Sequence, residues 1–184
     1  MDAVPDRRVQ RTRRQLREAL LTLIVERGWD AVSVRDICEK ADVGRSTFYV
    51  HFADKENLLL SGFDDLHAEM DGARARGEGQ FGFIEPFVVH AAENKHLLQA
   101  VHGCESAQQM QWRVRDMLRS LVDKELQLLE VAGTARGSAV RFIVGGITEL
   151  LMAWLDEPCG VSAGTLALEL QRHALAVVTV STAR

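Results

Sequence analysis

The polar side chains best placed to act together lie in residues 45–51, and six arginines precede them in residues 7–17. Arginine hydrogen-bonds to guanine edges and to phosphates, and hydroxyl groups add further contacts to a nucleic acid. The sequence shows no paired carboxylates, no Ser-His-Asp order and no glycine-rich phosphate loop. We therefore expect no enzyme, with no catalytic residue, no cofactor and no metal site. These residue types indicate recognition of nucleic acid rather than catalysis.

The segment that must present these groups, residues 33–52, has the pattern of two short helices joined by a tight break. Ser33 is suited to cap the first helix, and Asp36, three residues later, forms a weak version of a capping box. Phe48 and Phe52 recur four residues apart in the second helix, which is otherwise polar. This arrangement predicts a helix-turn-helix. The alternative is a helical hairpin that only packs.

Helical periodicity continues along the rest of the chain, and β-branched alternation is sparse, so we expect an all-α protein. Besides the two helices of the helix-turn-helix, we predict helices at residues 8–27, 54–76, 82–93, 95–101, 107–130, 135–156 and 162–180. The expected domains are an N-terminal head (1–53), a long connector helix (54–76) and a helical body (77–184), with the joint in the glycines of residues 77–82.

Composition narrows the classes of protein further. The chain has 184 residues, 47% of them hydrophobic, and a net charge of −4. The first sixty residues carry a slight basic excess and the remainder an acidic one, which favours a head that faces nucleic acid. Cys38, Cys104 and Cys159 are too few and too widely spaced for a disulfide framework. With no run of about 18 apolar residues and no signal-like N-terminus, we expect a cytoplasmic protein without a membrane partner.

Residues 10–60 resemble the DNA-binding head of the TetR/AcrR family of transcriptional repressors. The matching pieces occur in the family's order and spacing: Glu26-Arg27-Gly28-Trp29, Ser33-Val34-Arg35-Asp36-Ile37, Ala41-Asp42-Val43, Ser46-Thr47-Phe48-Tyr49-Val50-His51-Phe52 and Lys55-Glu56-Asn57-Leu58. The body resembles the family only in architecture. Two positions depart from the family pattern. Asp42 replaces a usual glycine and is expected to adopt a left-handed backbone, and Gly44 replaces a usual serine.

Residue chemistry and the resemblance together imply contacts to double-stranded DNA. We expect these contacts from Ser33, Arg45, Ser46, Thr47, Tyr49, His51 and Lys55. Arg45 is the candidate for reading a guanine, whereas Lys55, at a helix N-terminus, is expected to grip phosphate. His51 has a second interpretation as a packing residue.

The resemblance also implies a homodimer that pairs the last two helices of each chain. Gly145, Gly146 and Ala153 are small residues that permit close helix approach. The predicted interface consists of Ile143, Gly146, Ile147, Leu150, Trp154, Leu166, Leu170, His173 and Val177. The alternative is that both helices are internal core.

Finally, the resemblance implies that the body binds a small molecule, which releases the repressor from DNA. The candidate pocket residues are mostly aromatic, methionine or histidine, and predict a hydrophobic or aromatic ligand. They are Met70, Phe83, Phe87, His90, Leu98, His102, Trp112, Met117, Phe142 and Met152. The alternatives are a DNA-binding regulator that needs no ligand and one that senses thiol oxidation or a metal, although His96, His102 and Cys104 match no strong zinc pattern.

Overall fold

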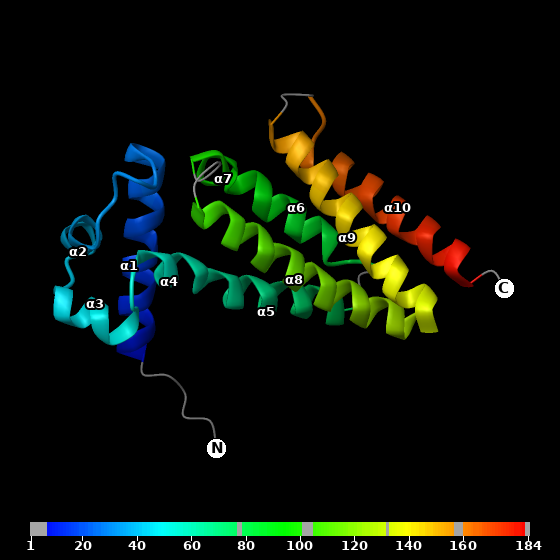
Figure 1. Cartoon of the computed structure of the whole chain (residues 1–184), viewed down its shortest axis with the longest axis horizontal. Coiled ribbons are helices and arrows are strands. Elements are labelled where there is room, and N and C mark those ends of the chain that lie inside the picture. Colours follow the sequence, from blue (N-terminus) through cyan, green and yellow to red (C-terminus); the bar gives the residue numbers. More distant parts are fainter. Residues whose placement is uncertain (1–6, 77–78, 101–104, 132, 157–159, 183–184) are drawn as a thin grey trace, which may run out of the picture. The chain divides into compact units, whose positions relative to one another are not determined.

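The computed structural model describes residues 7–76, 79–100, 105–131, 133–156 and 160–182, with side chains of the long helix after residue 104 described from residue 108 onward. All regular secondary structure in these ranges is helical, which confirms the predicted all-α class. The helices are α1 (Arg7–Arg27), α2 (Val34–Ala41), α3 (Arg45–His51), α4 (Lys55–Leu60), α5 (Gly62–Ala75), α6 (Ile84–Glu93), α7 (Lys95–Ala100), α8 (Glu105–Leu128), α9 (Gly133–Asp156) and α10 (Ala163–Thr182) (Figure 1).

The chain forms two compact units. The first contains Met1–Asp64 and His96–Gln108, and the second contains Asp65–Lys95 and Gln109–Arg184. The joint predicted in residues 77–82 begins with two residues outside the described ranges. The domain boundaries expected from the sequence remain a prediction.

Helix α1 supplies the core of the first unit through one apolar stripe. Leu16, Leu20, Leu23 and Ile24 recur at helical spacing and are fully or almost fully buried. The helix ends at Gly28, whose left-handed backbone (φ 78°) lets its N–H bond to the Ile24 carbonyl at 2.8 Å. Helix α1 thus matches the predicted helix, and its arginines are exposed except for the half-buried Arg17.

The single connector helix predicted over residues 54–76 is wrong in one respect, because the structure divides it into α4 and α5 at Ser61. The Ser61 hydroxyl donates to the Leu58 carbonyl at 2.7 Å, a local bond that competes with the helical ladder. Arg17 of α1 donates to the carbonyl and hydroxyl oxygens of Ser61, each at 3.3 Å. Gly62 follows and lies against the Arg17 side chain.

A buried carboxylate holds the turn before α6 in the second unit. Glu125 of α8 is buried, and its Oε1 accepts the N–H of Phe81 at 2.9 Å. Phe81 is fully buried and has a left-handed backbone (φ 57°), which is costly for a bulky residue. Gln171 of α10 donates to the Phe81 carbonyl at 3.4 Å. The turn before α6 is therefore fixed from both α8 and α10.

Glu125→Leu is expected to lower the free energy of unfolding by about 2 kcal/mol, because it leaves the buried Phe81 N–H without an acceptor. Glu125→Gln should lose clearly less, since an amide oxygen also accepts that bond. Urea unfolding of both variants measures the difference. Equal losses in the two variants would show that the hydrogen bond is not what Glu125 contributes.

Among the described residues, α9 is the one helix long and apolar enough to cross a membrane by length and composition alone. This is a weak indication, because the core helix of a globular protein passes the same test. Helix α9 buries Ile143, Val144, Ile147 and Leu151 within the chain.

Candidate nucleic-acid interface

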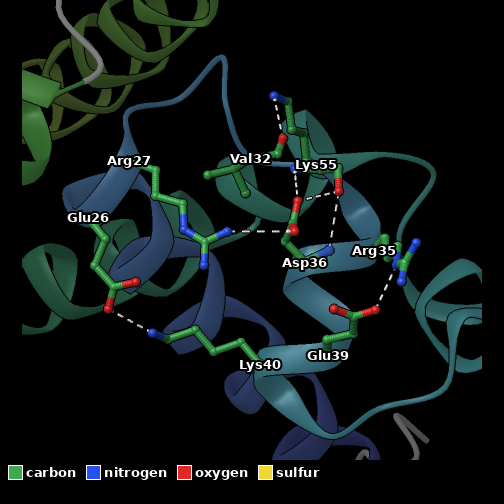
Figure 2. Close-up of polar contacts among 9 residues, drawn as sticks. Glu26, Arg27, Val32, Arg35, Asp36, Glu39, Lys40 and Lys55 are labelled. Atoms are coloured by element: carbon green, nitrogen blue, oxygen red, sulfur yellow. Dashed lines mark hydrogen bonds and ion pairs between the residues drawn. The ribbon is translucent and has the colours of Figure 1, made fainter.

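Helix α2 begins with the predicted capping box. The Ser33 hydroxyl accepts the Asp36 N–H at 3.2 Å, and the Asp36 carboxylate accepts the Ser33 N–H at 2.9 Å and the Ser33 hydroxyl proton. The Ser33 hydroxyl and backbone N–H lower the pKa of Asp36, and Arg27, 3.7 Å away, lowers it further. Figure 2 shows Asp36 between Arg27 and the start of α2. These bonds fix where α2 starts, and Ser33 remains exposed.

The turn between α2 and α3 has the backbone expected for it. Asp42 is left-handed (φ 52°, ψ 47°), as predicted from the residue that departs from the family pattern. The Val43 N–H bonds to the Cys38 carbonyl at 3.0 Å, which closes the end of α2. Gly44 is the N-cap of α3 in an extended conformation and supplies no side-chain bond. The turn therefore positions α3 through its backbone rather than through a capping hydroxyl.

Helix α3 is anchored from one side only. Phe48 is fully buried and Phe52 nearly so, their ring centroids 5.9 Å apart, which confirms both as core of the first unit. The Tyr49 ring stands edge-on to Phe48 at 5.3 Å. Five consecutive or near-consecutive side chains on the other side are exposed: Arg45, Ser46, Thr47, Tyr49 and Val50. Four of these are predicted DNA contacts, and their side chains are accessible to a partner.

Val50 is the residue that sequence reasoning missed. Its side chain is 78% exposed, the highest value among the exposed large hydrophobic residues of the described chain. A signal was available in the sequence, because Val50 follows the core residue Phe48 by two positions, about 200° around a helix. His51, by contrast, is only half-buried and lies at the end of α3 beside Phe52.

Lys55 is engaged within the head. Its ammonium donates to the carbonyls of Trp29 and Val32, both at 2.9 Å, and lies 4.4 Å from the centroid of the Trp29 ring. Figure 2 shows Lys55 directed at Val32. An ammonium has three protons, so these two bonds leave one for another partner. Lys55 therefore holds the loop between α1 and α2 against the start of α4, a role the sequence did not reveal.

Ion pairs cover the rim of α2 but do not include Arg45. Arg35 pairs with Glu39 at 2.7 Å, which raises the pKa of Arg35, and Lys40 pairs with Glu26 at 2.8 Å (Figure 2). Within the described ranges Arg45 has no ion-pair partner, so its guanidinium is accessible at the start of α3. Arg13 of α1 lies 5.0 Å from the centroid of the Phe52 ring, close to the other end of α3. Cationic groups therefore lie near both ends of the exposed helix.

Cys38 lies in the interior of the first unit, and its surroundings disfavour a reactive thiolate. It is buried in α2, and burial raises the pKa of its thiol while Arg45 lowers it to a smaller extent. Cys104 and Cys159 lie outside the described residues. Among the residues that are described, no group of three metal-ligating side chains is brought together.

The predicted pocket residues are spread over several environments. Met70, Phe83, Phe87 and Met117 are buried, and His90, Leu98 and Met152 are half-buried. Trp112 and Phe142 are 57% and 71% exposed, so they do not line the interior of a single chain. His102 lies outside the described residues. The small-molecule pocket remains a prediction.

The predicted dimer stripe lies along one side of α9 and one side of α10, and its members differ in burial. Ile143, Ile147, Leu166 and Leu170 are buried within one chain, and their part in a dimer interface remains a prediction. Gly146, Leu150 and His173 are exposed, and Trp154 and Val177 are half-buried. The Trp154 indole N–H donates to the Val161 carbonyl at 2.8 Å. The accessible side of α9 instead carries Phe142, Gly145, Gly146, Glu149, Leu150 and Ala153.

Comparison with known proteins places the helix-turn-helix in a family. The sequence profile described as bacterial regulatory proteins, tetR family, matches residues 16–61. An uncharacterized HTH-type transcriptional regulator of Bacillus subtilis, YxbF, is 44% identical over 55 residues, which are 29% of this chain and 14% of that protein. The chain therefore spans far less than two thirds of this relative, and the identity lies in a head-sized segment.

Solved structures share the fold over most of the chain. The dihydroxyacetone kinase operon activator DhaS superposes with a TM-score of 0.76 at 20% identity, covering 92% of this chain and 97% of that one. NalD, the secondary repressor of the MexAB-OprM multidrug efflux pump in Pseudomonas aeruginosa, superposes with a TM-score of 0.66 at 18% identity, covering 92% and 96%. Residues 16–61 therefore carry the sequence of the tetR family of bacterial regulatory proteins, and most of the chain shares the fold of solved transcriptional regulators.

Proposed function

We propose that this protein is a homodimeric, cytoplasmic transcriptional repressor that binds a pseudo-palindromic operator. The observation that carries the proposal is the exposed side of α3, whose accessible polar side chains stand on a helix anchored from behind by Phe48. A helix held in this way suits insertion into a major groove, where base edges carry distinct hydrogen-bond patterns. No catalysis is proposed.

Arg45 and the arginines of α1 have different tasks in this proposal. Arg45 is exposed, has no ion-pair partner in the described chain and begins the recognition helix, so its fork is suited to guanine O6 and N7. Arg13 and its neighbours on α1 would contact phosphates, which adds affinity without sequence preference. Ser33, Ser46, Thr47, Tyr49 and His51 complete the proposed contact set.

Two copies of the head are needed to read one operator. A two-fold dimer would place two recognition helices in successive major grooves, about 34–36 Å apart. The exposed side of α9 supports this assembly, because Phe142, Leu150 and the small residues Gly145, Gly146 and Ala153 form an accessible apolar surface. We therefore propose this side, together with the exposed side of α10, as the dimer interface, and it includes the predicted residues Gly146, Leu150 and His173.

Release of the operator by a small apolar ligand is the proposed regulation. A ligand that favours a state whose heads no longer match the groove would shift the equilibrium by its differential affinity. Buried Met70, Phe83, Phe87 and Met117 give the second unit an apolar interior that suits such a ligand. Sensing through Cys38 is disfavoured by its burial and raised pKa.

Selection of duplexes from a randomised pool by the full-length protein tests this function. We expect enrichment of a motif with two half-sites related by two-fold symmetry. Arg45→Ala should lose roughly tenfold discrimination at one base pair per half-site. The control is Arg119→Ala, which replaces an exposed arginine of α8 and should keep this discrimination. A selection that enriches no motif would contradict the proposal.

A further inference from the structure

We propose that Val50 reads the C5-methyl group of a thymine and so determines operator specificity at one base pair in each half-site. The inference rests on the proposed function and deepens it. It assigns a role to the most exposed hydrophobic side chain of the described chain. Val50 is absent from the DNA contacts predicted from the sequence.

The geometry of α3 places Val50 at the centre of its outward side. Phe48 is fully buried and marks the direction of the core. At about 100° per residue, Ser46 and Val50 lie about 160° from Phe48 on either side of the opposite direction. Arg45, Thr47 and Tyr49 lie closer to the flanks. When α3 enters a groove, Ser46 and Val50 are therefore the side chains that lie closest to the groove floor.

The immediate neighbours leave Val50 accessible. Ser46 stands one turn earlier on the same line and is small, so the helix can approach a groove floor closely there. Tyr49 is directed to one side by its edge-on contact with the Phe48 ring. The Val50 isopropyl group therefore projects from α3 beside the small Ser46, while the neighbouring Tyr49 ring keeps its edge-on contact with Phe48.

The chemistry of the side chain then selects its partner. An isopropyl group neither donates nor accepts a hydrogen bond, so it gains nothing from phosphates or from polar base edges. In the major groove the thymine C5-methyl is the apolar feature of the four bases, and contact with it removes both groups from water. If Val50 faced a polar base edge instead, it would displace the water that hydrates this edge, which is unfavourable. Val50 consequently favours T·A at its position and disfavours the other pairs.

Deoxyuridine scanning tests this contact at the level of one methyl group. In the duplex selected by the full-length protein, each thymine is replaced in turn by deoxyuridine, which keeps base pairing and removes only the methyl. At one symmetric position the replacement is expected to weaken binding about fourfold per head. The variant Val50→Ala should bind the parent duplex more weakly by a similar factor and lose its response to deoxyuridine at that position alone.

The matched control is Leu128→Ala, which trims a similarly exposed aliphatic side chain (68%) on α8 and should retain the full deoxyuridine response. Because Val50 is exposed and alanine favours helices, Val50→Ala should remain folded, which circular dichroism checks. If the protein selects a duplex but no thymine shows a Val50-dependent response, this inference is overturned and the proposed function stands. If no duplex is selected at all, both are overturned.

Discussion

Replacing Lys55 with methionine is expected to lower the free energy of unfolding of the head by about 3 kcal/mol. The ammonium donates two hydrogen bonds of 2.9 Å to the carbonyls of Trp29 and Val32 and lies over the Trp29 ring. Hydrogen bonds to a charged group contribute about 1.5–3 kcal/mol each, and a cation–π contact adds about 1 kcal/mol. Methionine preserves most of the aliphatic packing and removes only these polar contacts.

The same variant separates a structural role from a phosphate contact. If Lys55 mainly holds the loop between α1 and α2, the salt dependence of DNA binding should be unchanged at a temperature where the variant is folded. Lys40→Met is the control, since the Lys40–Glu26 pair is exposed and should contribute less than about 1 kcal/mol. Unchanged stability with a salt slope reduced by about 0.9 per head would instead assign Lys55 to phosphate, as the sequence predicted.

The second large effect is expected from Gly146→Trp, which should raise the dissociation constant of the dimer at least about a hundredfold. Gly146 is exposed on α9, and a Cβ placed there meets no atom within 4 Å, so one chain has space for a larger side chain. Packed helices approach to about 8–10 Å, and an indole between two copies of α9 would prevent that approach. Sedimentation velocity across a dilution series measures the change.

The control for this variant is Gln127→Trp, which adds the same side chain to an exposed position of α8 away from the proposed interface. It should leave the dimer intact. The Gly146→Trp monomer should keep its helix content, because removing a helical glycine raises helix propensity. A dimer that tolerates Gly146→Trp would place the interface elsewhere on the chain.

Local rules explain why much of the head was predictable from sequence. The capping box of Ser33 and Asp36 depends on residues three positions apart, and the left-handed backbone at Asp42 follows from a turn that usually carries glycine. Both involve only neighbours in the chain, as do the periodic stripes that define most of the helices. The structure confirms each of these features.

Contacts between distant segments were not predictable in the same way. Lys55 was expected to face phosphate, but two loop carbonyls, 23 and 26 positions earlier in the chain, accept two of its three protons. The break at Ser61 involves Arg17 from another helix. On α9, apolar residues occur on two sides, and only the packing inside the second unit shows that Ile143 and Ile147 belong to the core while Leu150 is exposed.

One ratio of affinities tests most directly whether the exposed side of α3 recognises a DNA sequence. It compares the selected duplex with a duplex of the same length and base composition in scrambled order, at one fixed salt concentration. We predict that the full-length protein binds the selected duplex at least about a thousandfold more tightly. A ratio near one would contradict the account, because binding would then depend on charge alone.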